Sequence, residues 1–333
     1  MHLCQYMQRT CLFLLCSFLT AASATAQEER TFSAQSNLVR VPTLVLDRNG
    51  APVLGLSLAN FIVEDDGIAQ TAHMDEGAES ESVSMMIAIQ CGRRAKREYG
   101  RMKGLSSTLD PVLSNPQSEA AVLFFDSKLN LARNFASNAD GVEMDLQKLP
   151  SGDSGAAILD AIAYSARLLG QRPKDHKRVL LLISETRDHG SQFTKLDEAL
   201  KAVDGNEVSV YALPFSPYVS QQLDDLRGSN RDEWTPGIDL LARFQDIGQA
   251  MRKNIPQAIA HLSGGEYQRF STQSAFENHL IDFANHLHSR YELSFEPNHP
   301  HPGLHQIRVR MRDPNSDRTL ICRTTYWVRS GGE

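Results

Sequence analysis

The amino-acid sequence predicts an α/β fold, a doubly wound and mostly parallel sheet inserted into a small antiparallel β module. Between residues 82 and 289, short apolar runs alternate with segments of helical periodicity, which is the pattern of a parallel sheet covered by helices on both faces. The flanking segments, 30–80 and 290–329, instead show strand patterns separated by turn residues. A length of 333 residues is typical of about two domains.

The first residues have the pattern of an export signal. Arg9 precedes the apolar run "CLFLLCSFLTAA", and Ala24-Thr25-Ala26 fits a small-residue cleavage site. The run is about a dozen residues long, whereas a membrane-spanning helix needs about 20. We therefore expect 1–26 to be a signal peptide cleaved near Ala26, an extracytoplasmic location (periplasmic or secreted), and no membrane span.

The amino-terminal β segment, 30–80, contains two turn signals. In "LVRVPTLVLDRNGAPVLGL" the tetrapeptide Asp47-Arg48-Asn49-Gly50 predicts a turn between two strands. In "FIVEDDGIAQTAHM" the tripeptide Asp65-Asp66-Gly67 predicts a second turn of the same kind.

The middle segment, 82–289, supplies the alternating elements. Strands are predicted at 83–89, 120–125, 178–184 and 207–215. Helices are predicted at 156–170, 195–203, 240–262 with a break at Pro256, and 275–288. Residues 216–237 form a polar loop that contains Trp234 and is too long to be a plain connection.

The carboxyl-terminal segment, 290–329, returns to strand patterns in "RYELSFEP", "HQIRVRMRD" and "TLICRTTYWV". The alternation of apolar and polar residues in the second run favours an antiparallel strand with one buried face. We predict that this segment packs with 30–80 as one β module, into which the α/β domain is inserted.

Composition excludes some classes of protein. The formal net charge is −6, which argues against a nucleic-acid binder, since such proteins show a basic excess. Only Cys91 and Cys322 lie outside the expected signal peptide, so the chain is no disulfide-dense scaffold. Whether these two cysteines pair is left open.

Several motifs occur in an order that resembles a secreted bacterial family, the VWFA-related acidobacterial proteins. "DRNGAPVLGL" and "NFIVEDDG" resemble the amino-terminal block of that family, and "HLSGGEYQRF", "SRYELSFEP", "HQIRVRM" and "ICRTTYW" resemble its closing blocks. The resemblance covers most of the chain after residue 26. It implies a von Willebrand factor type A domain with a metal-ion-dependent adhesion site, where Mg²⁺ accepts a carboxylate from a partner protein.

The motif of that metal site falls on residues that do not suit a metal. The D-x-S-x-S positions correspond to Ile89, Cys91 and Arg93, the threonine position to Ala156, and the last aspartate position to Glu185. Hard cations take oxygen ligands, but isoleucine and alanine offer none, cysteine is a soft thiol and arginine is a permanent cation. We therefore expect a degenerate adhesion site with no metal and no other cofactor.

The resemblance then implies protein–protein recognition without a metal. A basic tract follows the first strand of the α/β domain, and Arg93 would offer a guanidinium to an acidic partner, with Arg94, Arg97, Ser154 and Trp234 as further contacts. The alternative for this tract is a solvated helix face. We expect an exported interaction or adhesion module that is not an enzyme, and the partner and oligomeric state are left open.

Other chemistries were weighed. "GDSG" at 152–155 is similar to a serine-protease motif, but Ser154 lies at the start of a helical pattern, where Ser154 or Asp153 would cap the helix. Cys91 is either a buried apolar residue or, beside Arg93, a reactive thiol.

Six of the histidines lie between 279 and 305, namely His279, His286, His288, His299, His301 and His305. The last three flank a proline-rich turn and would form either a solvated loop or a Zn²⁺ or Cu²⁺ site. A histidine- or cysteine-based metal or redox protein therefore remains an alternative function, and a purely structural envelope protein is another.

Overall fold

The computed structural model describes residues 38–75, 82–93, 95–102, 104–137, 140–215, 254–314 and 316–328. The expected signal peptide, Arg94 and Trp234 lie outside the described residues. The α-helices are α2 (Leu105–Leu109), α3 (Asp140–Leu146), α4 (Ile158–Leu169), α5 (Leu196–Gly205), α8 (Ile255–Ser263) and α9 (Gln273–His288). None of the described helices is long and apolar enough to cross a membrane.

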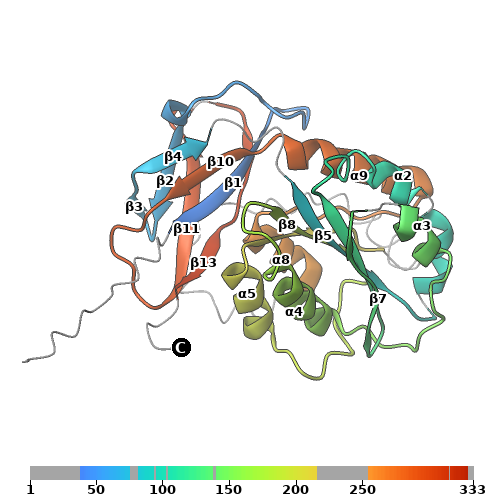
Figure 1. Cartoon of the computed structure of the whole chain (residues 1–333). Helices are drawn as coiled ribbons and strands as arrows, with labels where there is room; N and C mark the ends of the chain where they lie inside the picture. The colour runs from blue at the N-terminus through green and yellow to red at the C-terminus, as the bar shows by residue number, and fades with distance from the viewer. Residues whose placement is uncertain are drawn as a thin grey trace, which may run out of the picture. The chain divides into compact units, whose positions relative to one another are not determined.

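The central sheet has the strand order β7-β6-β5-β8-β9. Its members are β5 (Val83–Gln90), β6 (Glu119–Phe125), β7 (Leu129–Ala136), β8 (Lys177–Ile183) and β9 (Val208–Ala212). All neighbours are parallel except β7, which is antiparallel to β6. Helices lie on both sides of this sheet (Figure 1), so the prediction of a doubly wound, mostly parallel α/β domain is confirmed.

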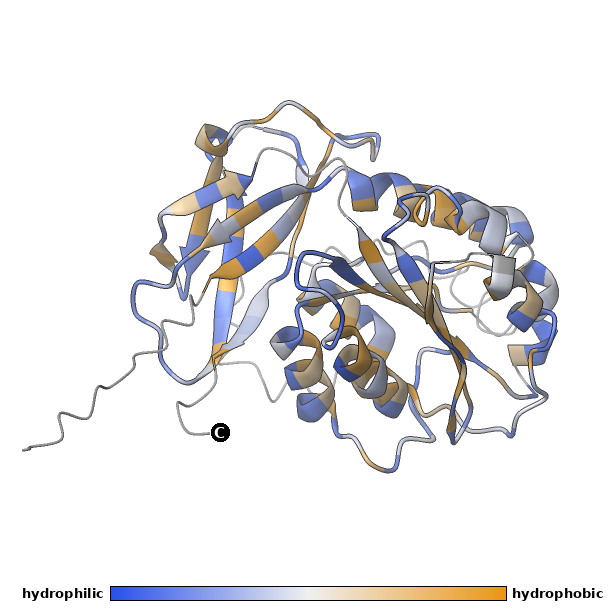
Figure 2. Cartoon of the chain, viewed as in Figure 1, coloured by the Kyte–Doolittle hydropathy of each residue, from blue (hydrophilic) through white to orange (hydrophobic). Residues whose placement is uncertain are grey.

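Two apolar layers sandwich the central sheet. Every residue of β5 is buried, as expected for the middle strand of a parallel sheet. In Figure 2, hydrophobic and hydrophilic residues are interspersed along the helices that cover this sheet. Side chains of one face pack with α2 and α9, and those of the other face pack with α4, α5 and α8. Helix α8 begins at Ile255 with Pro256 in its first turn, so Pro256 starts this helix, whereas the sequence predicted a break there.

The two ends of the chain pair with each other in two antiparallel sheets. One has the order β12-β1-β10-β4, and the other has the order β13-β11-β2-β3. The strands are β1 (Val39–Leu46), β2 (Phe61–Asp65), β3 (Ile68–Ala69), β4 (Ala72–Asp75), β10 (Tyr291–Phe295), β11 (Gly303–Met311), β12 (Thr319–Ile321) and β13 (Thr325–Val328). Apolar residues of both sheets form one common core.

One predicted strand of the β module does not form. After the turn at 47–50, the chain makes only an isolated bridge between Leu46 and Pro52. Strand β1 already pairs with β10 along its first half and with β12 along its second half. A hairpin with the residues after the turn would compete with these longer-range partners, and the local turn signal did not reveal that competition.

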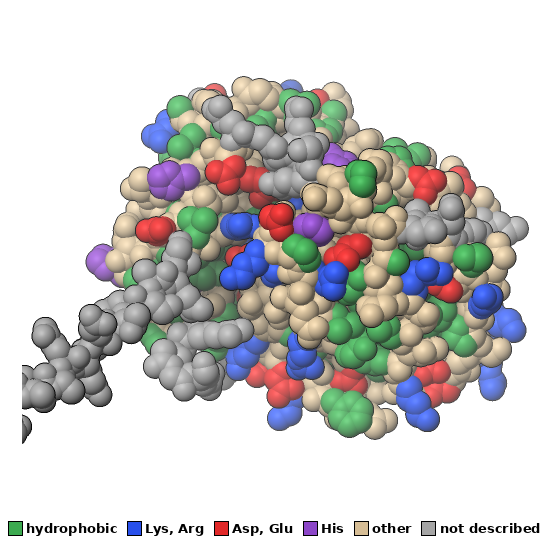
Figure 3. Space-filling model, viewed as in Figure 1, with side chains coloured by type: hydrophobic (Ala, Val, Ile, Leu, Met, Phe, Trp, Pro, Cys, Tyr) green, Lys and Arg blue, Asp and Glu red, His purple; other side chains and the backbone are tan. Residues whose placement is uncertain are grey.

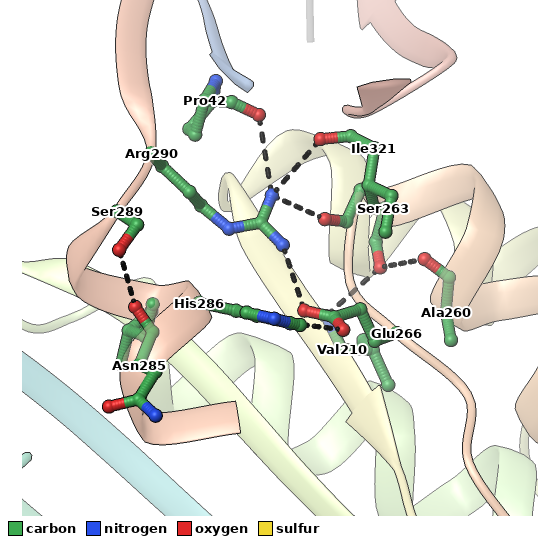
Figure 4. A network of polar contacts seen from close by, with 12 residues as sticks. Pro42, Val210, Ala260, Ser263, Glu266, Asn285, His286, Ser289, Arg290 and Ile321 are labelled. Carbon is green, nitrogen blue, oxygen red and sulfur yellow. Dashed lines mark hydrogen bonds and ion pairs between the residues drawn. The ribbon is translucent and has the colours of Figure 1, made fainter. Parts of the chain in front are cut away.

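Buried charges join the β module to the amino ends of the central strands (Figure 4). The Arg290 side chain donates to the carbonyl oxygens of Gly264 (2.8 Å), Pro42 (3.4 Å) and Ile321 (3.4 Å). Its guanidinium also pairs with Glu266 at 3.5 Å, and Glu266 bonds to Nδ1 of His286 at 2.8 Å. Arg290 therefore joins β1, β12 and the end of α8 at the amino ends of the central strands. We call this region the amino edge.

A second buried pair lies at the same amino edge. Arg323 pairs with Asp204 at 3.5 Å, and the Thr325 hydroxyl donates to the same carboxylate at 3.2 Å. Burial raises the pKa of Asp204 to about 6, against the opposing effect of Arg323. In addition, Lys177 at the start of β8 pairs with Glu292 on β10 at 3.1 Å.

Candidate functional site

The carboxyl ends of β5, β6 and β8 lead into loops that meet over the other end of the sheet. This carboxyl edge comprises residues 90–93, 126–128, 151–157 and 184–193. In open α/β sheets, ligands bind outside the carboxyl ends of the strands. The sequence analysis also placed the degenerate adhesion-site positions at this carboxyl edge.

Gly92 holds two of these loops in tight contact. Its φ is +112°, and a Cβ at this position would lie 2.1 Å from the carbonyl oxygen of Asp153. The Arg93 amide donates to that same carbonyl at 3.3 Å. Only glycine suits both the backbone conformation and the close approach, so the start of the basic tract is fixed against the 151–157 loop.

The carboxylates of Asp126 and Asp153 accept hydrogen bonds from groups of the surrounding loops. Asp153 accepts hydrogen bonds from the Ser127 hydroxyl, the Ser127 amide (3.2 Å) and the Gly155 amide (2.7 Å). Asp126 accepts from the amides of Asp153 and Lys128 at 2.9 and 2.8 Å. The hydrogen bond from the Ser127 side chain, followed by that from the Gly155 amide, lowers the pKa of Asp153.

The expectation that Asp153 or Ser154 caps the following helix is wrong. Helix α4 starts at Ile158, and its N-cap residue Ala157 offers no side-chain acceptor. The loop after β8 supplies the caps instead, because the amide of Leu159 donates to Asp188 (2.8 Å) and that of Asp160 donates to the Ser191 hydroxyl (3.0 Å). Asp153 is unavailable because its oxygens already bond to Ser127 and Gly155.

Glu185 lies in a buried polar group that the sequence analysis did not recognise. The Gln90 side chain accepts from the Glu185 amide at 2.7 Å and donates to the Glu185 carboxylate at 3.2 Å. The other carboxylate oxygen of Glu185 is 3.3 Å from Nε2 of His189. Gln90 is 2% exposed and Glu185 is 6% exposed, so this carboxylate is turned inward and satisfied by side chains. Gln90 is the last residue of a buried strand, and this position was the signal by which the sequence could have identified it.

The five degenerate adhesion-site positions do not converge on one point. Ile89 and Cys91 are buried in the apolar layer beneath α9, and Ala156 is buried in the layer on the opposite face of the sheet. Glu185 bonds to Gln90 as described, and only Arg93 is exposed. Ser154 is also exposed.

Cys91 has the environment of an apolar core residue. It is 2% exposed, and burial raises the pKa of its thiol to about 11. A thiol with a raised pKa is mostly protonated at neutral pH and is a poor nucleophile. Cys91 and Cys322 are both free, the first in the α/β core and the second against the β-module core.

The residues at the carboxyl edge do not fit a hard cation. Ile89 and Ala156 carry no oxygen, the Cys91 thiol is protonated, and Asp126 and Asp153 bond to backbone amides. Within the described ranges, only one group of three or more metal-ligating side chains lies close enough together to hold an ion, and it is in the β module.

Positive side chains line the exposed side of the carboxyl edge. Arg93, Lys96, Arg97 and Arg187 are exposed, and the structure gives them no ion pair with any described residue. The basic tract forms two 3-10 turns, at Ala95–Arg97 and Tyr99–Arg101, in place of the helix face considered from the sequence.

Phe193, in the loop after β8, is an exposed aromatic residue that the sequence analysis missed. Its side chain is 86% exposed, while its amide donates to Asp160 at 3.2 Å. The loop is thus anchored by its backbone and presents the ring to solvent. No pattern in the sequence distinguishes this phenylalanine from a buried one.

The six carboxyl-terminal histidines are distributed over separate places. His286 bonds to Glu266 at the amino edge, and His279 bonds through Nε2 to the Arg269 carbonyl at 3.0 Å. His301 and His305 lie together beside Asp66, whereas His299 is exposed and outside that group.

No protein-family model matches the chain, and no curated protein matches it. Several solved structures are similar to it. An aerotolerance-related membrane protein from Bacteroides fragilis is 18% identical, covers 61% of this chain and 99% of its own, and has a TM-score of 0.41. A von Willebrand factor type A protein from Catenulispora acidiphila is 10% identical, covers 88% of this chain and 75% of its own, and has a TM-score of 0.43.

Proximal thread matrix protein 1 from the mussel byssus is 13% identical, covers 61% of this chain and 47% of its own, and has a TM-score of 0.42. The chain is therefore similar to proteins with von Willebrand factor type A domains. Because all three TM-scores lie below 0.5, the fold class rests on the strand order and the helix layers of this chain itself.

Proposed function

We propose that this chain is an exported recognition module whose carboxyl edge binds an acidic protein partner without a metal ion. The observation that carries the proposal is the charge arrangement of this edge. Its carboxylates are occupied by amides and side chains, while Arg93, Lys96, Arg97 and Arg187 point their charges to solvent. Exposed cations attract negative charge, and at this edge they act against the charges that the hydrogen-bonded carboxylates keep.

The chemistry of the same residues supports metal independence. A carboxylate on the partner would approach Arg93, whose guanidinium can form two parallel hydrogen bonds to it. The backbone of Arg93 is fixed by Gly92 and Asp153, so less conformational freedom is lost on binding. Phe193 adds an apolar contact of the kind that often anchors interfaces.

We also propose that the chain is not an enzyme. The described residues include one serine–histidine contact, in which the Ser84 hydroxyl lies 2.9 Å from Nδ1 of His176. Ser84 is fully buried and its hydroxyl donates to Glu119 at 2.7 Å, so His176 cannot serve as the base that accepts the hydroxyl proton. The buried Cys91 thiol is likewise unsuited to nucleophilic attack.

The test is capture of partners from an extracytoplasmic fraction on immobilised protein, with and without EDTA, followed by affinity measurement with the recovered protein. We expect capture to survive EDTA and to weaken as salt rises, because exposed charges are screened over about 8–10 Å. Arg93→Glu should weaken binding at least about tenfold at low salt, and Arg93→Lys should weaken it less, since it keeps the charge and loses the planar fork.

Arg167 on α4 is the matched control, because it is exposed and lies outside the carboxyl edge. Arg167→Glu changes the net charge by the same amount and should bind as the unaltered chain does. If Arg93→Glu and Arg167→Glu bind equally well, the carboxyl edge is not the recognition surface. Binding that EDTA abolishes would instead contradict metal independence.

A further inference from the structure

The strongest unassigned cluster lies in the β module, at the turn between β2 and β3. Asp65 ends β2, and Asp66 and Gly67 form the turn with φ values of 48° and 81°. The amide of Gln306 donates to Oδ1 of Asp66, and the amide of Asp66 donates to the Gln306 carbonyl, both at 2.9 Å. These bonds hold the turn against the start of β11, where His305 is located.

Ligand atoms of Asp66, His301 and His305 all lie within 4.8 Å of one another at this turn, and Asp65 lies beside His305. Nδ1 of His305 is 2.9 Å from Oδ2 of Asp66 and 3.4 Å from Oδ1 of Asp65. Nε2 of His301 is 3.4 Å from the same Oδ2 of Asp66. Ligands about 2.0–2.1 Å from a tetrahedral zinc ion lie about 3.3 Å from one another. The observed separations therefore suit ligands around one small ion.

The hydrogen bonds of His305 leave one ring nitrogen directed at carboxylates. Nε2 lies 2.7 Å from the His301 carbonyl, which can only accept, so Nε2 carries a hydrogen. In neutral histidine, Nδ1 then carries a lone pair and no hydrogen. The His305 side chain is 1% exposed and that of Asp65 is 6% exposed, and neither Nδ1 nor Oδ1 of Asp65 has a hydrogen-bond partner among the described residues.

A buried lone pair that faces carboxylate oxygens needs a positive charge between them. A bound metal ion supplies that charge, and the Nε2 bond to a carbonyl is the kind of outer contact that orients a metal-binding histidine. The Tyr326 hydroxyl donates to Oδ2 of Asp65 at 2.9 Å, which fixes the carboxylate and leaves Oδ1 directed at His305. The Tyr326 ring also stacks on His305 with centroids 4.8 Å apart.

The cluster is open to solvent on one side. The side chains of His301 and Asp66 are 61% and 26% exposed, so an ion can enter between them. The His301 ring now stacks on His305 with centroids 4.0 Å apart, and it must turn to bring Nε2 toward a shared ion. Its exposure permits that rotation.

We propose that Asp66, His301 and His305 form a site for a divalent transition-metal ion of the Zn²⁺ class, with Asp65 beside His305. Two imidazole nitrogens with carboxylate oxygens suit Zn²⁺, Cu²⁺ or Ni²⁺, whereas Mg²⁺ and Ca²⁺ take oxygen ligands alone. The ion would connect the β2–β3 turn to the loop between β10 and β11 and to the start of β11. This site is separate from the carboxyl edge and independent of the function proposed for that edge.

The experiment uses the full chain prepared without a histidine tag, stripped with EDTA and then titrated with ZnCl₂ in a calorimeter. We expect one equivalent to bind and to raise the melting temperature, because an ion that binds only the native state stabilises it. MgCl₂ should do neither. Co²⁺ in place of Zn²⁺ gives an independent readout, since visible absorption reports its coordination directly.

His301→Gln and Asp66→Asn should each weaken Zn²⁺ binding at least about tenfold, since each removes a ligand. His301 is exposed, so this variant should fold even where a substitution of the buried His305 does not. His299→Gln, in the loop between β10 and β11 and outside the cluster, is the matched control and should bind Zn²⁺ normally.

Absence of Zn²⁺ binding by the unaltered chain at neutral pH would overturn the proposal. Binding that survives both His301→Gln and Asp66→Asn would place the metal elsewhere and overturn it equally.

Discussion

At the amino edge of the central sheet, buried ion pairs join the α/β domain to the β module. At the carboxyl edge, the carboxylates bond mainly to loop backbone, and the cations face solvent. Two aspartates show the difference. Burial raises the pKa of Asp204 to about 6 at the amino edge, while hydrogen bonds from Ser127 and Gly155 lower the pKa of Asp153 at the carboxyl edge. Figure 3 shows positive and negative side chains interspersed over one face of the molecule.

The contrast shows that charged side chains at the amino edge stabilise the structure, whereas those at the carboxyl edge are available for contact with another molecule. A buried charge depends on its partner, because an unpaired ion away from water is strongly unfavourable. An exposed cation on a fixed backbone has no such requirement and remains available to a partner molecule. Substitutions of the charged residues at the two edges should therefore differ in kind, with stability lost for the buried pairs of the amino edge and binding lost for the exposed cations of the carboxyl edge.

The largest effect is expected for Arg290→Met at the amino edge. The substitution removes the charge that faces buried Glu266 and three carbonyl contacts, so the free energy of unfolding should fall by about 3–5 kcal/mol. Urea denaturation measures this change. Arg167→Met, at an exposed position on α4, is the control and should change stability by less than about 0.5 kcal/mol. Equal effects of the two variants would show that the buried contacts of Arg290 do not contribute to stability.

Gly92→Ala should be the most destabilising single change at the carboxyl edge. The new Cβ would lie 2.1 Å from the Asp153 carbonyl oxygen at a φ of +112°, so we expect a loss of about 3 kcal/mol from strain and loop displacement. Gly100→Ala is the control, since nothing lies within 4 Å of a Cβ there. A melting temperature unchanged by Gly92→Ala would show that the two loops separate easily.

Gln90→Leu tests the polar group around Glu185. The change keeps a similar volume but leaves the buried Glu185 amide without its acceptor, which should cost about 1–3 kcal/mol. Gln171→Leu, at an exposed position after α4, provides the comparison and should have little effect. Should Gln90→Leu prove neutral by denaturant titration, Gln90 would have no role in holding Glu185 inward.

A smaller, pH-dependent effect is expected from His286 at the amino edge. Burial lowers the pKa of His286, but the hydrogen bond and charge of Glu266, with help from Asp282, outweigh burial and Arg290, so the net pKa is raised. A raised pKa contributes stability that is fully present below the unfolded value of about 6.5 and is lost as pH rises through the folded pKa.

The measurement is the difference in unfolding free energy between the unaltered chain and His286→Gln across pH 5 to about 8.5. Taking the difference removes the contributions of other titrating groups. The advantage of the unaltered chain should shrink as pH rises over this window. An advantage that is constant or grows with pH would show that His286 is not stabilised in its charged form.

The smallest expected effect is that of Mg²⁺ or Ca²⁺ on the carboxyl edge. With no suitable oxygen set around Ile89, Ala156 and Glu185, millimolar concentrations should leave the melting temperature unchanged within error. Glu185→Ala is the diagnostic variant. A stabilisation by Mg²⁺ that Glu185→Ala abolishes would show that this edge retains a metal site.

Periodicity in the sequence was sufficient to predict β5, β6, β8 and β9 and helices α4, α5 and α9, because buried strands and amphipathic helices leave local patterns, but the edge strand β7 was not predicted. The start of α4 was not predictable in the same way. Its first amides are capped by Asp188 and Ser191, which are about thirty positions away, and a capping residue is read from sequence only when it is adjacent. The missing strand after Gly50 has a similar cause, since distant strands occupy both sides of β1.

For the candidate sites, the sequence by itself determined which side chains are present and which chemistry they lack. It showed that the Ile89, Ala156 and Arg93 side chains offer no ligand to Mg²⁺, and that histidines gather around the segment between β10 and β11. Only the tertiary structure decided that Gln90 meets Glu185 and that Phe193 is exposed. It also brought His301 and His305 to Asp65 and Asp66, more than two hundred positions earlier in the chain. The physical reason is that sequence patterns report local burial, whereas a site depends on distances between strands that only sheet pairing fixes.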